Sequence, residues 1–144
     1  MYILVPGAWH RAEHFSDLEK ELQKAGYSTR TVQPGCVSAV PASDSFQPDV
    51  YATKEVLIEQ LSTATDIILC MHSYGGFYGT EASGLVLSDM HKYPGRLRRL
   101  VYIAAYVPVE GQTVMQMIGD KPPPAADINH VDVDLVSIRP ATHE

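Results

Sequence analysis

The sequence predicts an α/β fold, in which a parallel β-sheet is flanked by helices. Two observations predict it: short apolar runs recur along the chain, and stretches with helical spacing of apolar residues separate them. Strands that alternate with helices are joined by right-handed crossovers, so neighbouring strands run parallel. With 144 residues, of which 45% are hydrophobic, the chain is long enough to bury one compact core, and no linker divides it.

The first elements follow from local patterns near the N-terminus. Residues 2–5, Tyr-Ile-Leu-Val before Pro-Gly, are nearly all apolar, which is typical of a strand buried on both faces. A capping-box pattern that begins at Ser16, followed by apolar residues at helical spacing, predicts a helix over residues 17–25 with Gly26 as its C-terminal cap. Residues 27–32, with alternating threonines, predict a second strand.

The later elements continue the alternation. Residues 33–48 contain three prolines and are predicted to be loop, whereas residues 50–61 place apolar side chains on one helical face. Residues 66–71 form the strongest predicted strand. Residues 75–88 lack proline and carry small side chains that favour a helix packed closely on the sheet, and residues 100–106 predict a fourth strand.

Composition and charge exclude several classes of partner. The formal net charge is −6, and the basic residues are scattered apart from Arg96, Arg98 and Arg99, so we expect no nucleic-acid partner. No run approaches the roughly 18 apolar residues that a membrane helix needs, and the N-terminus lacks the features of a signal peptide. The two cysteines are Cys36 and Cys70, and the second lies in an apolar run. This usage argues against a disulfide framework and predicts a cytoplasmic protein.

A serine stands between the strongest predicted strand and the helix after it, in Cys-Met-His-Ser-Tyr-Gly-Gly. A sharp turn there would expose the Ser73 hydroxyl above the N-terminus of the helix. The Tyr74 N–H would then be one donor to an oxyanion, and the Ala8 N–H would be the second, because Gly7 permits an unusual backbone path. The position two before the serine is usually glycine in such turns, and Met71 could crowd it. Alternatively, Ser73 only caps the helix.

A resemblance to a known family is carried by four segments: LVPGAWH, GYSTRTVQPG, LCMHSYGG and LVYIAAYVPVEGQT. Together they resemble the N-terminal part of the α/β-hydrolase superfamily, close to its small esterase-like members, from residue 1 to about residue 120. The resemblance implies a Ser, acid, His triad that acts on an ester or related acyl bond without metal or cofactor. It implies Ser73 as nucleophile and Ala8 and Tyr74 as oxyanion donors.

The resemblance also implies a longer chain, in which later strands supply the acid and the histidine of the triad. We therefore expect residues 1–110 to form the N-terminal part of an incomplete hydrolase core of about four strands. Residues 111–144 would form part of a lid with some flexibility. A chain that stops within its lid would leave the fourth strand as an exposed edge, so we also expect a homo-oligomer.

Other side chains are candidates for the missing roles. Of six histidines, His10 is the best placed as a base, because its loop ends at the same sheet edge as the serine. Glu110 is an acid candidate by position alone. Trp9, His72 and Phe77 are candidates for contact with a small ester-like substrate, although aromatic residues near a sheet edge often serve packing instead.

Three alternative functions stay open at this point. Residues 10–14 match H-x-x-E-H, a zinc signature, but the predicted helix starts after them and no third ligand is evident, so we expect no metal. The chain could be a non-catalytic remnant that binds a small molecule or a partner chain. Lyase chemistry in the same fold is the third alternative.

Overall fold

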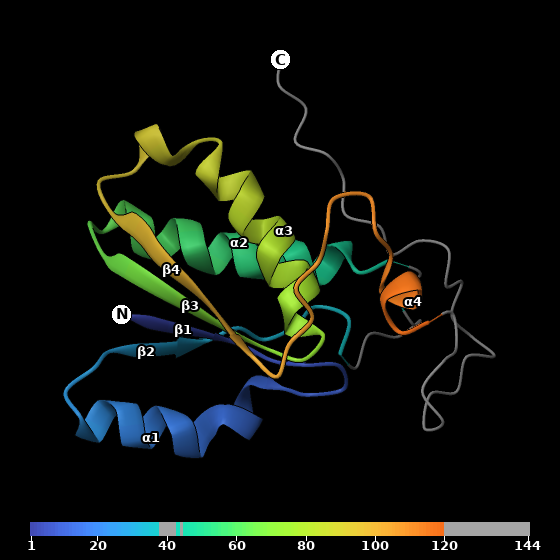
Figure 1. The fold of residues 1–144 in the computed structure, drawn as a ribbon. Helices are drawn as coiled ribbons and strands as arrows, with labels where there is room; N and C mark the ends of the chain where they lie inside the picture. The colour runs from blue at the N-terminus through green and yellow to red at the C-terminus, as the bar shows by residue number, and fades with distance from the viewer. Residues whose placement is uncertain (38–42, 44, 120–144) are drawn as a thin grey trace.

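The computed structural model of the chain describes residues 1–37, 43 and 45–119. Within them, a four-stranded parallel sheet has the order β2-β1-β3-β4 (Figure 1). The strands are β1 (Tyr2–Val5), β2 (Thr29–Thr31), β3 (Asp66–His72) and β4 (Arg96–Ile103). The α-helices are α1 (Ser16–Lys24), α2 (Gln47–Ser62), α3 (Gly75–Leu87) and α4 (Val114–Met117), and the 3-10 helices are η1 (Ala12–Phe15) and η2 (Met90–Lys92). The predicted α/β class is confirmed.

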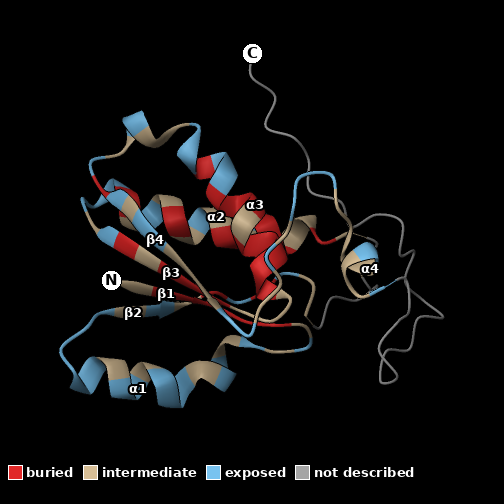
Figure 2. Ribbon diagram, in the orientation of Figure 1, coloured by how far each residue is buried: buried red, intermediate tan, exposed pale blue. Residues whose placement is uncertain are grey.

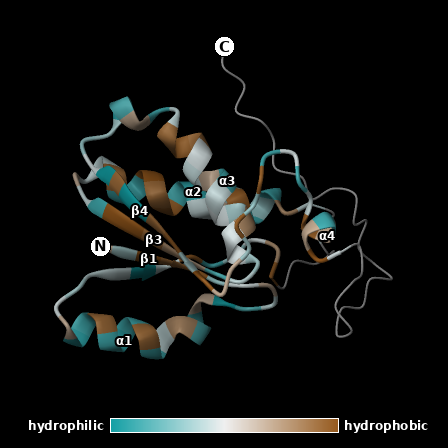
Figure 3. Ribbon diagram, viewed as in Figure 1, coloured by the Kyte–Doolittle hydropathy of each residue, from teal (hydrophilic) through white to brown (hydrophobic). Residues whose placement is uncertain are grey.

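The main core lies on one side of the sheet. Helices α2 and α3 cover that face, and α1 lies on the opposite face (Figure 1). Buried and apolar residues gather between the sheet and the α2–α3 pair (Figures 2 and 3). The buried cluster consists of Ile3, Val5, Val32, Phe46, Val50, Leu57, Leu61, Ile67, Leu69, Met71, Tyr78, Ala82 and Val86. Helix α1 contains no buried residue, so it contributes less to this core.

Helix α1 begins differently from the prediction. Ser16 is its first residue rather than its cap, and no side chain of the described residues caps this helix, because η1 runs directly into it. At the start of η1, the Arg11 N–H donates to Nδ1 of His14 at 2.9 Å. The C-terminal end agrees with the prediction, since Gly26 has a φ of +85° and stops the helix.

Strand boundaries differ where the sequence is polar. Strand β4 lies earlier than the predicted residues 100–106, because arginines on an edge strand can point into solvent without breaking the ladder. One of them, Arg98, pairs with Asp66 on β3 at 2.9 Å. Ala104, with a φ of 43°, then turns the chain away from the sheet. Strand β2 is shorter than the predicted residues 27–32.

Two further segments test the sequence prediction. Helix α2 takes in the end of the predicted loop 33–48, because Pro48 lies in its first turn, where the missing N–H of proline costs nothing.

The short helix α4 lies after β4. The segment at 120–144, which includes most of the predicted lid, lies outside the described residues. In the described ranges, no helix is both long and apolar enough to cross a membrane.

Candidate active site

Ser73 occupies a strained turn between β3 and α3. Its φ is 52°, in the left-handed region that costs a residue with a Cβ about 1–3 kcal/mol. Segments on both sides hold this conformation. The Ser73 N–H donates to the Ile103 carbonyl at 3.4 Å, and the Ser73 carbonyl accepts the N–H groups of Tyr106 at 3.2 Å and Gly76 at 3.0 Å. The side chain is half-buried, and none of the described residues hydrogen-bonds its hydroxyl.

Glycines make room for this turn against the neighbouring strands. A Cβ on Gly75 would lie 2.8 Å from the Val5 carbonyl oxygen, so only glycine fits there. A Cβ on Gly79 would lie 2.7 Å from Sδ of Met71. The Met71 side chain, which the sequence suggested could crowd the turn, is therefore accommodated under α3 by the missing side chain of Gly79.

The loop after β1 lies directly against the turn. A Cβ on Gly7 would lie 3.0 Å from the Cβ of Ser73, so these two backbone segments are in near contact. The His10 N–H donates to the Gly7 carbonyl at 3.2 Å and closes a tight turn. Within it, Trp9 has a φ of 61° and is 70% exposed. A strained and exposed aromatic residue is unusual in a loop that has only a structural role.

Two backbone N–H groups at this edge have no acceptor in the part of the chain that the structure describes. Neither the Ala8 N–H nor the Tyr74 N–H donates to any acceptor among the described residues. Ala8 follows Gly7 on the β1 loop, and Tyr74 precedes the first turn of α3, where the helix dipole is positive. Free N–H groups that are partly shielded from water attract a carbonyl or anionic oxygen.

His10 is engaged within its own loop. Its Nδ1 lies 2.8 Å from the Ala8 carbonyl oxygen. Because a carbonyl can only accept, Nδ1 carries the proton of the neutral ring and Nε2 is the basic nitrogen. The ring also packs edge-on against His14 at 5.1 Å and against His72 at 5.8 Å between ring centroids. The sequence did not predict this group of three imidazoles, since it forms only when the β1 loop folds over the end of β3.

Of the remaining predicted site residues, Phe77 is buried and Glu110 is exposed. Phe77 is fully buried and packs against Tyr106 at 5.7 Å and Tyr74 at 6.4 Å between ring centroids. It therefore supports the turn from below and does not line an open surface. Glu110 is exposed beyond β4.

A cleft of about 540 Å³ is lined by Ala8 and Tyr74, whereas neither Ser73 nor His10 is among its lining residues. It lies at the carboxyl ends of the strands, where open α/β sheets bind their ligands. Its lining comes from the β1 loop, the β2 loop, the start of α2 and the turn into α3: Gly7, Ala8, Trp9, Arg11, Pro34, Cys36, Val37, Ser43, Asp49, Tyr74 and Tyr78. Among the described residues, sequence reasoning missed Asp49 and Cys36, which only the tertiary fold brings to this place.

Asp49 is the buried charge of the cleft. Only 2% of its surface is exposed, and its Oδ1 accepts the Cys36 N–H at 2.7 Å. Burial raises the pKa of Asp49 above its ordinary value, although the backbone N–H groups nearby oppose this. Burial, together with the Asp49 charge, also raises the pKa of Cys36 to about 11. The Cys36 thiol is therefore neutral near pH 7 and is a poor nucleophile.

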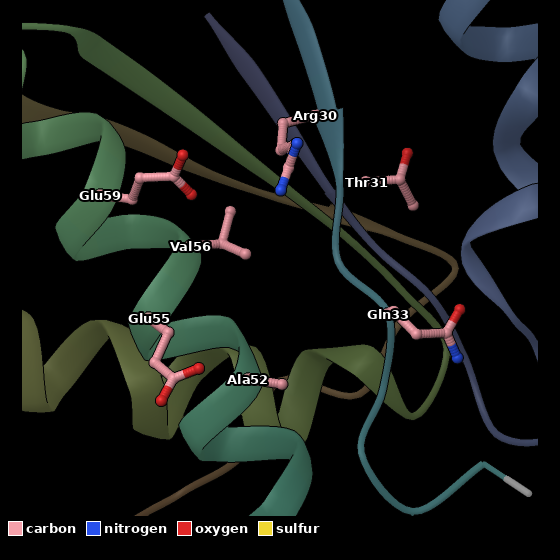
Figure 4. Close-up of a pocket in the computed structure, with 7 residues that line it drawn as sticks. All are labelled: Arg30, Thr31, Gln33, Ala52, Glu55, Val56 and Glu59. Atoms are coloured by element: carbon pink, nitrogen blue, oxygen red, sulfur yellow. The ribbon is translucent and has the colours of Figure 1, made fainter.

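A second hollow, of about 480 Å³, lies away from Ser73 between β2 and α2 (Figure 4). Its lining mixes Arg30, Thr31 and Gln33 with Glu55, Glu59 and two small apolar residues of α2. The figure shows Arg30 on the strand side and the two glutamates on the helix. Nothing in this hollow resembles a nucleophile with a base beside it.

Metal-ligating side chains do not gather in the described ranges. No group of three or more His, Cys, Asp or Glu residues there is arranged to hold a metal ion. His10 lies in a turn and His14 in η1, so the H-x-x-E-H residues do not share one helical face.

Comparison with known proteins agrees with this architecture. The sequence profile of the Alpha/beta hydrolase family matches residues 2–142. The chain is 30% identical over 122 residues to Alpha/beta hydrolase nvfD of Aspergillus novofumigatus, an alignment that covers 84% of this chain and 49% of that protein. It is 27% identical over 125 residues to the Carbendazim hydrolyzing esterase of a Nocardioides species, with 85% and 49% covered. The chain thus spans about half the length of these curated relatives. On the family match and these relatives together, the chain belongs to the alpha/beta hydrolase family.

Proposed function

We propose that this chain carries the nucleophile side of a serine hydrolase site that acts on a small ester or related acyl bond. Ser73 is the nucleophile at the tip of the elbow between β3 and α3. The Ala8 and Tyr74 N–H groups form the oxyanion hole. One observation carries the proposal: a serine with a φ of 52° stands beside two N–H groups that have no acceptor among the described residues.

The chemistry follows from these positions. The Ser73 hydroxyl oxygen attacks the acyl carbon, the carbonyl oxygen becomes negative, and the two N–H groups stabilise that charge. The hydroxyl proton must pass to a base. We propose His10 for that role, because its Nε2 is the basic nitrogen of the ring and its loop contacts the turn. The His10 ring would have to rotate away from Ala8, His14 and His72 and toward Ser73 before it could accept the proton. The proposed site therefore has a nucleophile and oxyanion donors but, among the described residues, no base in position.

Further features of the proposal rest on the family. One relative is named for hydrolysing carbendazim, which supports a small-molecule substrate of the ester or acyl type. We propose that residues 1–110 form the N-terminal part of the hydrolase core and that residues 111–144 belong to a lid. A cytoplasmic location and chemistry without a cofactor complete the proposal.

A fluorophosphonate probe tests the nucleophile. Attack by an activated Ser73 displaces fluoride and leaves one phosphonate label for each chain, which mass spectrometry counts. We expect labelling of the wild type and of the control Ser88→Ala, whose hydroxyl only caps the end of α3. We expect no labelling of Ser73→Ala. Labelling that persists in Ser73→Ala would refute the assignment.

The base is tested in the same assay. If His10 takes the proton, His10→Gln should slow labelling at least about tenfold, whereas His14→Gln should leave it near the wild-type rate. Equal rates for both variants would remove His10 from the site.

The second candidate function is a non-catalytic remnant that binds a small molecule or a partner chain. It is favoured by one observation, that none of the described side chains hydrogen-bonds the Ser73 hydroxyl. A folded wild-type chain that takes no label would support this alternative.

A further inference from the structure

The cleft lined by Ala8, Tyr74 and Asp49 combines hydrogen-bond groups of both kinds, which a site for simple esters does not need. We propose that this cleft binds aromatic secondary amides. The amide carbonyl would accept from the Ala8 and Tyr74 N–H groups, the amide N–H would donate to Asp49, and the aryl ring would lie on Trp9. The inference rests on the proposed function in one respect, namely the use of the two N–H groups.

Asp49 supplies the acceptor. It is one of the residues that line the cleft, and only 2% of its surface is accessible, so only a small part of Asp49 meets the cavity. A carboxylate has about four lone-pair sites for hydrogen bonds. The backbone N–H groups of Gly35 and Cys36 and the Cys36 thiol use three of these sites, the Cys36 N–H at 2.7 Å. A donor from the cleft can therefore still bind to the carboxyl group.

The donors and the aromatic surface lie along the same cavity. Ala8 and Tyr74 both line it, and their N–H groups have no acceptor among the described residues. Trp9 lines it as well, 70% exposed and held at a φ of 61°. The volume of about 540 Å³ falls in the range of small-molecule sites.

A secondary amide matches this pattern better than an ester does. In a trans amide, the N–H and the C=O lie in one plane and point in opposite directions, so each can reach a different wall of a cleft. An ester in the same place would satisfy the two N–H donors and leave Asp49 facing a group with no hydrogen to donate. A site built to accept an N–H rejects the isostere that lacks one, because a buried acceptor is then left unpaired.

The fluorescence of Trp9 provides the assay, because it is the only tryptophan of the chain. The probes are acetanilide and phenylacetone, which differ only in N–H against CH2 beside the carbonyl. We expect acetanilide to bind the wild type at least about tenfold more tightly, the size of effect typical of a hydrogen bond to a charged group. Equal dissociation constants for the two probes in the wild type would overturn the inference, whatever any variant does.

Variants assign the preference to its source. Asp49→Asn keeps an oxygen for the Cys36 N–H but presents NH2 to the cleft, so the preference for acetanilide should fall to within about twofold. If the variant keeps its circular dichroism spectrum and the full preference, Asp49 is not the acceptor. Should this variant not fold, N-methylacetanilide on the wild type replaces it: removal of the N–H should cost the same affinity, and unchanged binding would refute the inference.

The same assay separates this inference from the proposed function. Neither probe is an ester, and Ser73→Ala should keep the full preference for acetanilide. Loss of fluorophosphonate labelling with intact selectivity would refute the hydrolase proposal alone. Labelling without selectivity would refute the amide site alone.

Discussion

Gly7 faces the side chain of Ser73 so closely that a Cβ built on Gly7 would lie 3.0 Å from the Ser73 Cβ. The same Cβ would lie 3.1 Å from Nδ1 of His72. The loop after β1 and the turn after β3 are therefore positioned by each other, although 66 residues separate Gly7 from Ser73 in the sequence (73 minus 7). The missing side chain of Gly7 lets the loop after β1 lie close against the turn at Ser73.

Gly7→Ala should impair the site more than the fold. The new methyl group meets Ser73 and must push the two loops apart by a few tenths of an ångström, at a cost of about 1–3 kcal/mol. We expect fluorophosphonate labelling to slow at least about tenfold, since the proposed oxyanion donors would shift. Gly84→Ala is the control, because a Cβ there meets nothing within 4 Å. It should leave labelling unchanged and stabilise α3 by about 0.5–1 kcal/mol in urea unfolding.

Two glycines of α3 should differ in their tolerance of a side chain. A Cβ on Gly76 would overlap the Tyr106 carbonyl oxygen, which the backbone fixes in place. A Cβ on Gly79 would meet Sδ of Met71, which a flexible side chain can move. Gly76→Ala should therefore cost about 3 kcal/mol or more and Gly79→Ala about 1–2 kcal/mol, measured by urea unfolding. The reverse order would contradict the close approach of α3 to the Tyr106 segment.

Asp49 should make the stability depend on pH. Burial raises its pKa in the folded chain above the ordinary 3.8, so the folded state binds the proton more tightly than the unfolded state. In the window between these two pKa values, the free energy of unfolding must fall as the pH rises. Asp49→Asn removes this contribution. The wild type should therefore lose stability relative to the variant as pH increases from about 3 to about 7 in urea unfolding. A constant difference across that range would show that the Asp49 pKa is not raised.

Cys36 should resist alkylation although it lines the cleft. Its pKa is raised to about 11 from the ordinary 9.0, chiefly by burial. The thiolate fraction near pH 8 should then be about 100-fold below that of an unperturbed thiol. We expect iodoacetamide to modify Cys36 about 100-fold more slowly in the folded chain than in urea, as followed by peptide mass spectrometry. Comparable rates in both states would contradict the raised pKa.

The edge of the sheet at β4 should support self-association. No described strand pairs with the outer side of β4, and Ile103 at its end is 41% exposed. We expect the wild type to form oligomers as its concentration rises in analytical ultracentrifugation. Val101→Lys places a charge in the middle of this edge and should favour the monomer, whereas Leu87→Lys at the end of α3 should not. A wild-type chain that stays monomeric at high concentration would contradict this prediction.

Sequence patterns of a few residues correctly predicted the first strand, the helix after Ser73 and the turn between that helix and the strand before it. The strand 2–5 was predicted from its apolar run, because a strand buried on both faces has few polar positions. The helix over 75–88 and the turn at Ser73 were predicted from the change between an apolar run and small residues. These signals lie within a few residues of the feature that they specify.

Predictions failed where a distant segment decides the outcome. The start of β4 was missed because arginines interrupt its apolar run, whereas the pairing with β3 that extends this strand is a tertiary contact. Ser16 was predicted to cap α1, but η1 continues directly into that helix. Such boundaries depend on which surfaces the rest of the chain leaves open.

The sequence by itself determined the fold class, the position of Ser73 at a strand-to-helix turn and the membership of a hydrolase lineage. Only the tertiary structure decided that Asp49 and Cys36 line a cleft beside the Ala8 and Tyr74 N–H groups. The physical reason is that hydrophobic periodicity acts over a few residues, whereas a cleft forms where several crossings of a parallel sheet end at one edge. No local pattern records which side chains will meet there.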